Sequence, residues 1–258
     1  MTAKGHPVSA RTTILITGAS SGLGEEMARQ FAALGHDLAL CARRTDRLTA
    51  LRSELETAHP GQRFEVRPLD VNDHDQVFAV FRAFKADFGR IDRVVINAGL
   101  GKGAPLGTGG FEANRQTAMT NFVGALAQTE AALEIFRSQN AGHLVMIASM
   151  SAVRGMPGTA TTYAATKAGV AHLAEGVRAE MYGTPVKVSV IYPGYIRSEM
   201  NAKVKHAPFI VSTGKGVAAI VDAVEKQKPR AHVPAWPWMP VGVALRHLPL
   251  PLARRLMG

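Results

Sequence analysis

The stretch TGASSGLG, residues 17–24, stands between an apolar segment and an amphipathic one. The preceding letters TTILI are rich in β-branched and aliphatic residues and predict a buried strand. After the stretch, Met27, Phe31 and Leu34 recur at helical spacing, and Gly35 is suited to a C-cap. This order predicts a glycine turn that carries the chain from the carboxyl end of a strand into a helix.

The glycines of this turn follow the spacing G-x-x-x-G-x-G. We expect Gly18 to permit the tight turn, Gly22 to let a pyrophosphate approach the main chain, and Gly24 to let the helix pack closely on the strand. Free N–H groups at the helix N-terminus would favour an anion there. A flexible loop without a ligand would show the same glycines. The rest of the chain is therefore needed to distinguish a nucleotide-binding turn from such a loop.

Composition and length indicate one globular α/β domain, with 258 residues, 47% hydrophobic and 19% charged. Cys41 is the only cysteine, which excludes an intramolecular disulfide and favours a reducing, cytoplasmic location. Histidine and cysteine show no metal-ligand spacing, so no metal site is expected. Residues 1–11 lack the apolar core of a signal peptide and are expected to form a flexible arm.

The formal net charge of +10 is unevenly distributed along the chain. Residues 1–24 carry +2 and residues 200–258 carry +7, whereas residues 25–199 carry only +1. No helix-turn-helix or RNP pattern accompanies the basic excess, so nucleic acid is not expected as a partner. Anionic lipid, an acidic partner or simple solubility are better explanations of the basic C-terminal part.

Apolar strand-like runs alternate with helical patterns along residues 12–233, without a linker or a repeat. Strands that are apolar on both faces and alternate with helices predict a doubly wound parallel sheet, Rossmann-like, of about seven strands with helices on both faces. Ligands of such sheets bind at the carboxyl ends of the strands. The expected strands are 14–17, 38–42, 64–69, 93–97, 143–149, 186–192 and 230–234, and the expected helices are 23–34, 45–58, 73–88, 110–138, 161–182 and 213–227.

The segment YAATK places Tyr163 and Lys167 four residues apart in a predicted helix, on one face. A phenol with a pKa near 10 is a poor acid–base group at neutral pH, and a neighbouring cation would lower that pKa. An exposed pair on a helix surface would look the same in isolation. In chain order, TGASSGLG, NAG at 97–99, a serine after an apolar strand, YAATK and the PG of YPGYIRSEM (192–200) resemble the short-chain dehydrogenase/reductase family over about residues 12–228.

The resemblance implies the catalytic roles. Tyr163 would be the acid–base that exchanges a proton with the substrate oxygen, and Lys167 would lower its pKa and bind the nicotinamide ribose. Asn121 would support a water-linked proton path. Ser149 would hold the substrate oxygen; it precedes Tyr163 by 14 residues, where the family often has 13, and Ser151 is the fallback. Neither serine lies in a G-x-S-x-G elbow, which argues against a serine hydrolase.

The residues after the second expected strand predict the cofactor. An acid that would bind the ribose 2′-OH of NAD is expected where Ala42 stands, and Arg43 and Arg44 follow it. A guanidinium pairs well with a 2′-phosphate, so we predict NADP(H), with Arg43 the first candidate and Arg44 the second. Asp46 lies too far along to replace the missing acid, and both arginines could instead be solvated.

Further cofactor contacts follow from the resemblance at the ends of other strands. Asp70, with Val71, would lie beside adenine, Pro193 and Gly194 would pack the nicotinamide, and the segment through Ser198 would approach its carboxamide. The complete expected set is Gly18, Ser20, Ser21, Gly22, Leu23, Gly24, Arg43, Arg44, Asp70, Val71, Asn97, Ala98, Gly99, Tyr163, Lys167, Pro193, Gly194, Ile196 and Ser198.

The C-terminal extension, residues 234–258, is basic, apolar and proline-rich. Its prolines and Arg246 interrupt any membrane-spanning run. Two interpretations remain: the extension packs on its own or a neighbouring subunit, or it makes peripheral membrane contact through its tryptophans and arginines. The loop at 201–213 would cover the substrate, and Met200, Phe209 and Ile210 would line the site or pack beneath the loop.

The sequence thus predicts an NADP(H)-dependent enzyme that interconverts a carbonyl and an alcohol. The alternative is a catalytically silent NADP(H)-binding sensor or scaffold of the same fold. The resemblance also implies a homodimer or homotetramer, formed through the helices near 110–138 and 161–182. Nothing in the sequence identifies the carbonyl compound.

Overall fold

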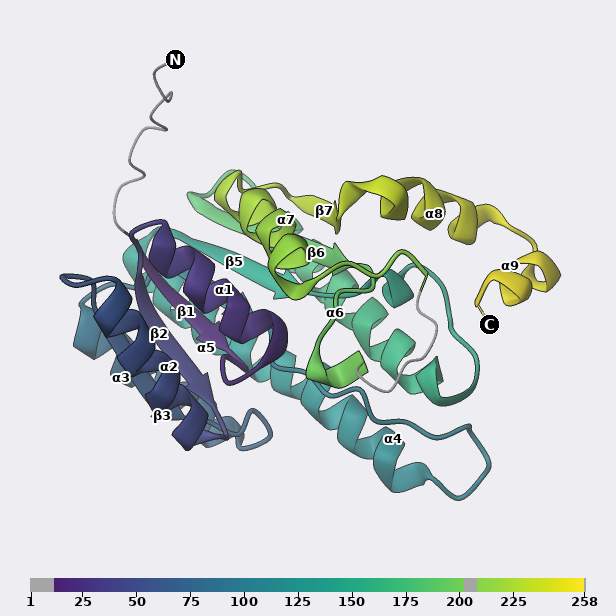
Figure 1. Cartoon of the computed structure of the whole chain (residues 1–258), viewed down its shortest axis with the longest axis horizontal. Helices are drawn as coiled ribbons and strands as arrows, with labels where there is room; N and C mark the ends of the chain where they lie inside the picture. The colour runs from purple at the N-terminus through teal and green to yellow at the C-terminus, as the bar shows by residue number, and fades with distance from the viewer. Residues whose placement is uncertain (1–11, 202–207, 258) are drawn as a thin grey trace, which may run out of the picture.

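The computed structural model describes residues 12–201 and 208–257, so the arm expected at 1–11 lies outside the described residues. Within the described ranges, seven strands form one parallel sheet in the order β3-β2-β1-β4-β5-β6-β7 (Figure 1). This confirms the predicted fold class. The strands are β1 (Thr13–Thr17), β2 (Asp37–Ala42), β3 (Phe64–Pro68), β4 (Arg93–Ile96), β5 (Gly142–Ile147), β6 (Val186–Pro193) and β7 (Arg230–Val233).

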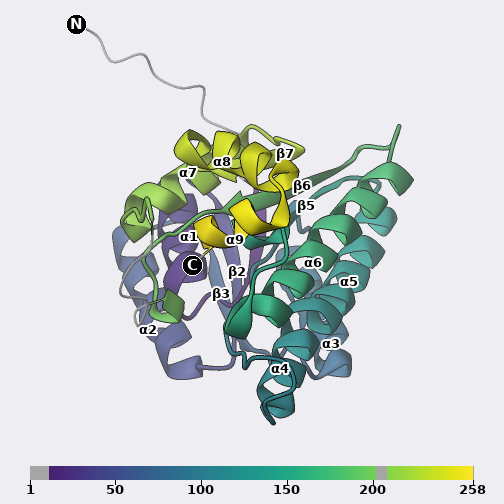
Figure 2. The ribbon, with the colours of Figure 1, turned by 90° about the vertical axis from the view of Figure 1, so that its right-hand side faces the viewer.

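Helices cover both faces of the sheet, as Figure 2 shows: α1, α2 and α7 lie on one side, and α3, α5 and α6 on the other. The strand order reverses between β1 and β4, and a crevice is expected at the carboxyl ends of these neighbours. The helices are α1 (Gly22–Ala33), α2 (Thr45–Ala58), α3 (His74–Phe88), α4 (Phe111–Ala118), α5 (Gly124–Gln139), α6 (Thr161–Glu180), α7 (Thr213–Glu225), α8 (Ala235–His247) and α9 (Leu250–Met257).

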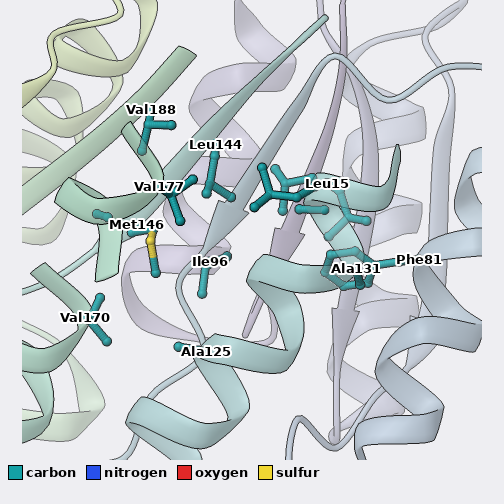
Figure 3. Packing of buried hydrophobic residues seen from close by; sticks show 14 of the residues in the cluster. Leu15, Phe81, Ile96, Ala125, Ala131, Leu144, Met146, Val170, Val177 and Val188 are labelled. Atoms are coloured by element: carbon teal, nitrogen blue, oxygen red, sulfur yellow. The ribbon is translucent and has the colours of Figure 1, made fainter. Parts of the chain in front are cut away.

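Strand β1 shows why both faces of the sheet are apolar. Leu15 joins the core that α3, α5 and α6 cover, whereas its neighbours Ile14 and Ile16 join the core beneath α1, α2 and α7. Successive side chains of a strand point to opposite faces, so a fully apolar strand fills two cores at once. Figure 3 shows the first of these cores, where Leu15, Ile96 and Leu144 from three strands pack with residues of the covering helices.

The structure differs from the sequence-based prediction at two elements. The single helix expected over 110–138 consists of α4, a π-helical turn at Met119–Val123 and α5. In this turn the N–H of Gly124 donates to the carbonyl of Met119, and such a wider turn leaves no mark on a 3.6-residue pattern. The strand expected over 143–149 ends at Ile147, so Ser149 follows the strand rather than ending it.

The C-terminal extension continues directly from β7 and forms α8 and α9 (Figure 1). Trp238 belongs to the core and is 5% exposed. The guanidinium of Arg154 donates to the carbonyls of Leu245 (2.8 Å) and Leu248 (2.5 Å), which ties α8 to the segment after β5. The extension therefore packs on its own chain, while Trp236 and other apolar side chains of α8 and α9 remain exposed.

Candidate active site

A cavity of about 480 Å³ lies along the carboxyl edge of the sheet. It brings together segments from the ends of β1, β2, β3, β4, β5 and β6 with α6. All the expected site residues line it except Gly24 and Asn121, which support its wall. The expected residues in the lining are Gly18, Ser20, Ser21, Gly22, Leu23, Arg43, Arg44, Asp70, Val71, Asn97, Ala98, Gly99, Ser149, Tyr163, Lys167, Pro193, Gly194, Ile196 and Ser198.

The glycine turn forms one wall of this cavity and requires its glycines. Gly18 and Gly22 have φ values of +67° and +58°, which side chains rarely adopt. A Cβ at Gly24 would lie 2.4 Å from the carbonyl oxygen of Gly18, so α1 packs against the turn itself. The turn delivers the N-terminus of α1 to the cavity, which is the arrangement that binds a pyrophosphate.

Thr17 holds the glycine turn to the neighbouring strand end, a role that sequence reasoning missed. Its hydroxyl is fully buried and accepts from the main-chain N–H groups of Asn97 and Ala98, both at 3.1 Å. The amide of Asn97 donates in return to the carbonyls of Thr17 (3.0 Å) and Gly18 (3.4 Å). The two turns are thus locked together. A threonine at a strand end is too common to indicate this in a sequence.

The two arginines after β2 have different surroundings. Arg44 donates to Ser20 at 3.4 Å and pairs with Glu199 at 3.1 Å, and Arg47 pairs with the same carboxylate. Arg43 is exposed at the cavity and forms no hydrogen bond or ion pair within residues 12–201 and 208–257. Arg43 is therefore the better placed of the two to receive an added anion. Glu199 also lines the cavity, and it was not predicted as a site residue because its partners lie about 150 residues away.

Ser149 and Tyr163 meet at the same end of the cavity. Burial raises the pKa of the Tyr163 phenol, and a hydrogen bond with the Ser149 side chain partly opposes that rise. Ser149 also accepts from the N–H of Ser151 at 3.2 Å, at the start of a short 3₁₀ turn. The Ser151 hydroxyl is buried, does not line the cavity and has no hydrogen-bond partner among the described residues. The geometry favours Ser149 over the fallback.

Lys167 is buried and lines the cavity. Its ammonium donates to the carbonyl of Ile147 at 2.8 Å and lies 5.9 Å from the centre of the Tyr163 ring. Burial lowers the pKa of Lys167 to about 8. The sequence led us to expect that the Lys167 ammonium lowers the pKa of the Tyr163 phenol. In the protein by itself the pKa of this phenol is raised instead, because Tyr163 is buried.

Asn121 lies in the π-helical turn and is 1% exposed. Its Oδ1 accepts from the N–H of Leu100 at 2.6 Å, and its Nδ2 donates to the Leu100 carbonyl at 2.9 Å and to Thr166 Oγ1 at 3.3 Å. A Cβ at Gly99 would lie 3.4 Å from Asn121 Oδ1 and 3.6 Å from Lys167 Nζ. The side chain of Asn121 thus fixes the cavity wall beside the lysine.

Two further features concern the described part of the chain. Residues 12–201 and 208–257 hold no group of three or more histidine, cysteine, aspartate or glutamate side chains arranged to bind a metal. No helix in the described part of the chain is long and apolar enough to cross a bilayer. Residues 202–207 of the loop expected over the substrate lie outside the described residues.

Known proteins are similar to this chain in sequence and in fold. The family model described as short chain dehydrogenase matches residues 12–208. An uncharacterized oxidoreductase of Mycobacterium tuberculosis is 52% identical over 245 residues, which cover 95% of this chain and 97% of the relative. A short-chain dehydrogenase/reductase from Burkholderia phymatum, solved in complex with NAD, covers 95% of both chains with a TM-score of 0.82 and 22% identity. Serine dehydrogenase, solved in its closed form with NADP⁺, covers 83% of this chain and 89% of its own, with a TM-score of 0.74 and 27% identity.

The chain therefore belongs to the short-chain dehydrogenase/reductase family and is an oxidoreductase. Members of this family use NAD(H) or NADP(H), as the two solved structures illustrate. The glycine turn fits such a dinucleotide, because Gly18 and Gly22 line the cavity with positive φ values and Gly24 lets α1 pack directly against the main chain of Gly18.

Proposed function

We propose that this protein is an NADP(H)-dependent oxidoreductase that interconverts a carbonyl compound and an alcohol. The observation that carries the proposal is the convergence of Ser149, Tyr163 and Lys167 on one cavity that the glycine turn and Arg43 also line. A bound nicotinamide would supply the hydride. The protein's own residues orient the substrate and move the proton.

In the direction of reduction, the phenol of Tyr163 donates a hydrogen bond and then its proton to the substrate oxygen. This phenol carries its proton at neutral pH, because the ordinary pKa of tyrosine is near 10 and burial raises it further. Ser149 lines the same cavity and acts on the pKa of the Tyr163 phenol, which supports a role for its hydroxyl in holding the same oxygen. Reduction is the favoured direction because cellular NADP pools usually drive it.

Lys167 and Asn121 would both support the path that returns a proton to Tyr163, one at each end of it. The Lys167 ammonium has two donors left after its bond to Ile147, and we assign them to the nicotinamide ribose and to a water. Asn121 keeps the wall beside this ammonium in place through its bonds to Leu100. The path would return a proton to Tyr163 after each turnover.

Arg43 supports the choice of NADP(H) over NAD(H). The guanidinium of Arg43 lines the cavity, has no partner in the described chain and is therefore available to a 2′-phosphate. The guanidinium of Arg44 is already paired with Glu199. Ala42 stands where an acid would repel the phosphate. A guanidinium binds phosphate oxygens through two parallel N–H donors.

The experiment for this proposal is an NADPH-oxidation screen over aliphatic, aromatic, steroid, quinone and acyl-thioester carbonyls. The expected result is turnover of at least one class, which Tyr163→Phe abolishes while NADPH still binds. Tight NADPH binding without turnover of any carbonyl would contradict the proposal and favour the sensor or scaffold instead. Light scattering of the same preparation would test the expected homodimer or homotetramer.

A further inference from the structure

A short turn after β6, residues 198–201, borders the cavity with all four of its residues. Asn201 holds this turn in shape. Its Oδ1 accepts from the N–H of Ser198 at 2.9 Å, and its Nδ2 donates to the carbonyl of Ile196 at 2.6 Å. Ile196 in turn forms a parallel bridge with Val211. The turn therefore has a defined conformation and a fixed base on the domain.

Consecutive side chains of this turn contact different parts of the molecule around the cavity. A Cβ at Gly22 would lie 3.5 Å from Ser198 Cβ, so Ser198 lies against the glycine turn. A Cβ at Gly101 would lie 2.8 Å from the Met200 side chain, so Met200 packs on the segment after β4. Between these two residues, Glu199 reaches the start of α2. The turn thus spans the cavity and is supported on several sides of it.

The carboxylate of Glu199 is held by two arginines. Its Oε2 accepts from Arg44 at 3.1 Å, and its Oε1 accepts from Arg47 at 2.5 Å. The two guanidinium groups lower the pKa of Glu199 below its usual value, so the carboxylate is charged at neutral pH. Arg44 also donates to Ser20 of the glycine turn at 3.4 Å. These ion pairs, the Glu199 bridge, join the turn after β6 to residues that follow β2.

The Glu199 bridge connects two walls of the cavity. Arg44 lines the cavity on the side of β2 and Glu199 lines it on the side of β6, and the two side chains are paired with each other. A dinucleotide in this cavity has to fit between these two walls. Exposed ion pairs contribute little to stability, but a contact that must break before a ligand leaves acts on the rate of release.

We propose that Glu199 retains the bound cofactor: its bonds to Arg44 and Arg47 hold the turn 198–201 across the dinucleotide, and these bonds break when the dinucleotide leaves. The inference goes beyond the proposed function, because it concerns how long the cofactor stays and not which reaction follows. Arg43, and not the Glu199 bridge, is assigned to the 2′-phosphate. Loss of the bridge should therefore speed the release of NADH as well as that of NADPH.

Two substitutions that change the local charge in opposite directions test the proposal. Glu199→Gln removes a negative charge and both ion pairs of the bridge, whereas Arg47→Gln removes a positive charge and one ion pair. We expect both to speed the dissociation of NADPH, by about five-fold and about two-fold, because each exposed ion pair is weak. The rates are measured in a stopped-flow fluorimeter by chasing bound NADPH with excess NADP⁺.

The directions of the two changes separate retention from a simple effect of charge. If Glu199 acted only by repelling an anionic cofactor, Glu199→Gln would slow the dissociation of NADPH and Arg47→Gln would speed it. Slower or unchanged dissociation in Glu199→Gln would therefore overturn the inference. The matched control is Glu180→Gln, which breaks a similarly exposed ion pair with Arg137 away from the cavity and should leave the rate unchanged.

A covalent form of the bridge gives a second test. Cys41 is the only cysteine and is fully buried, so the double variant Arg47→Cys with Glu199→Cys carries two accessible thiols, one at each end of the bridge. Linking these thiols with a short bismaleimide while NADPH is bound should retain the NADPH through gel filtration. Each single variant, treated in the same way, should lose it.

The outcomes of this second test are distinct from those of the proposed function. Loss of NADPH from protein that mass spectrometry shows to be linked would overturn the inference. NADH is tested in parallel, so that a different cofactor preference does not hide retention. Because the measurement needs binding only, retention without turnover of any carbonyl would contradict the proposed reaction and leave the role of Glu199 intact.

Discussion

At the scale of single residues, the choice between Ser149 and Ser151 depends on which hydroxyl already has partners. Ser149 lines the cavity with Tyr163 and accepts from a main-chain N–H, whereas the buried Ser151 hydroxyl has no partner in the described chain. Ser149→Ala should lower kcat about 100-fold, because the substrate oxygen loses a positioned donor. Ser151→Ala should leave kcat within about two-fold and stability unchanged or slightly higher. Steady-state kinetics and thermal melts check both, and the reverse ranking would contradict the assignment of Ser149.

Cofactor preference is also decided by single side chains. Arg43→Gln should lower kcat/KM for NADPH about 10- to 100-fold, since a charge-assisted bond to the 2′-phosphate is lost, and should leave NADH unaffected. Arg47→Gln is the matched control: it removes an arginine of the same region that pairs with Glu199 and does not line the cavity. Equal effects of Arg43→Gln on both cofactors, or a wild-type preference for NADH, would argue against a 2′-phosphate site at Arg43.

At the scale of elements, a buried polar cluster joins β4, β5 and α7 at the edge of the sheet opposite the cavity. Arg93 donates to His143 Nδ1 at 3.1 Å and pairs with Glu225, and His143 Nε2 bonds to Ser189 at 2.8 Å. Burial and the charge of Arg93 lower the pKa of His143 to about 3. Burial alone would raise the pKa of Glu225, but His36, whose Nε2 lies 3.5 Å from the carboxylate, and the charge of Arg93 hold it at about 2.

This cluster predicts loss of stability in acid. Between pH 6.5 and 3 the unfolded chain protonates His143 while the folded protein does not, so the free energy of unfolding falls as the pH falls, by up to about 1.4 kcal/mol per pH unit. Glu225 adds to the loss between pH 4.5 and 2. Urea titrations of His143→Gln should show a shallower pH dependence than wild type between pH 6.5 and 5. The control is His172→Gln on the exposed face of α6, whose slope should match wild type.

Sequence periodicity predicted the regular elements well and their interruptions poorly. The strands were predicted because buried parallel strands are continuously apolar, a property that each segment shows by itself. The π-helical turn that holds Asn121 was not predicted, since the residues on either side of it keep a helical pattern. Thr17 was missed as a link between strand ends because its partners lie about 80 residues away.

At the scale of the whole molecule, the extension has an inner and an outer side. The inner side, with Trp238 and Gly242, packs on the domain, while Trp236, Met239 and Val243 are exposed, as are Leu250 and Leu252. No acidic residue follows Glu225, and α8 and α9 carry Arg246, Arg254 and Arg255. Such a surface is complementary to anionic lipid headgroups.

We expect the intact protein to sediment with vesicles of phosphatidylcholine and phosphatidylserine, and less with phosphatidylcholine alone. Replacing Arg246, Arg254 and Arg255 by Gln should weaken this binding, as should added salt, since each cation contributes about 1 kcal/mol near an anionic surface. Truncation is a poor test, because it would also remove the buried Trp238. Equal recovery with both kinds of vesicle, or none with either, would argue against electrostatic membrane contact.

The sequence by itself determined the sheet, the edge of the sheet that carries the cavity, and most of the residues that line that cavity. It could do so because apolar periodicity and the glycine, tyrosine and lysine spacings are local properties of the chain. Only the tertiary structure decided that Arg44 is shared with Glu199 and Arg43 is not, that Ser151 is cut off from the cavity, and that the C-terminal extension places a tryptophan beside Gly194. Each of these depends on contacts between segments far apart in sequence, whose partners no local pattern records.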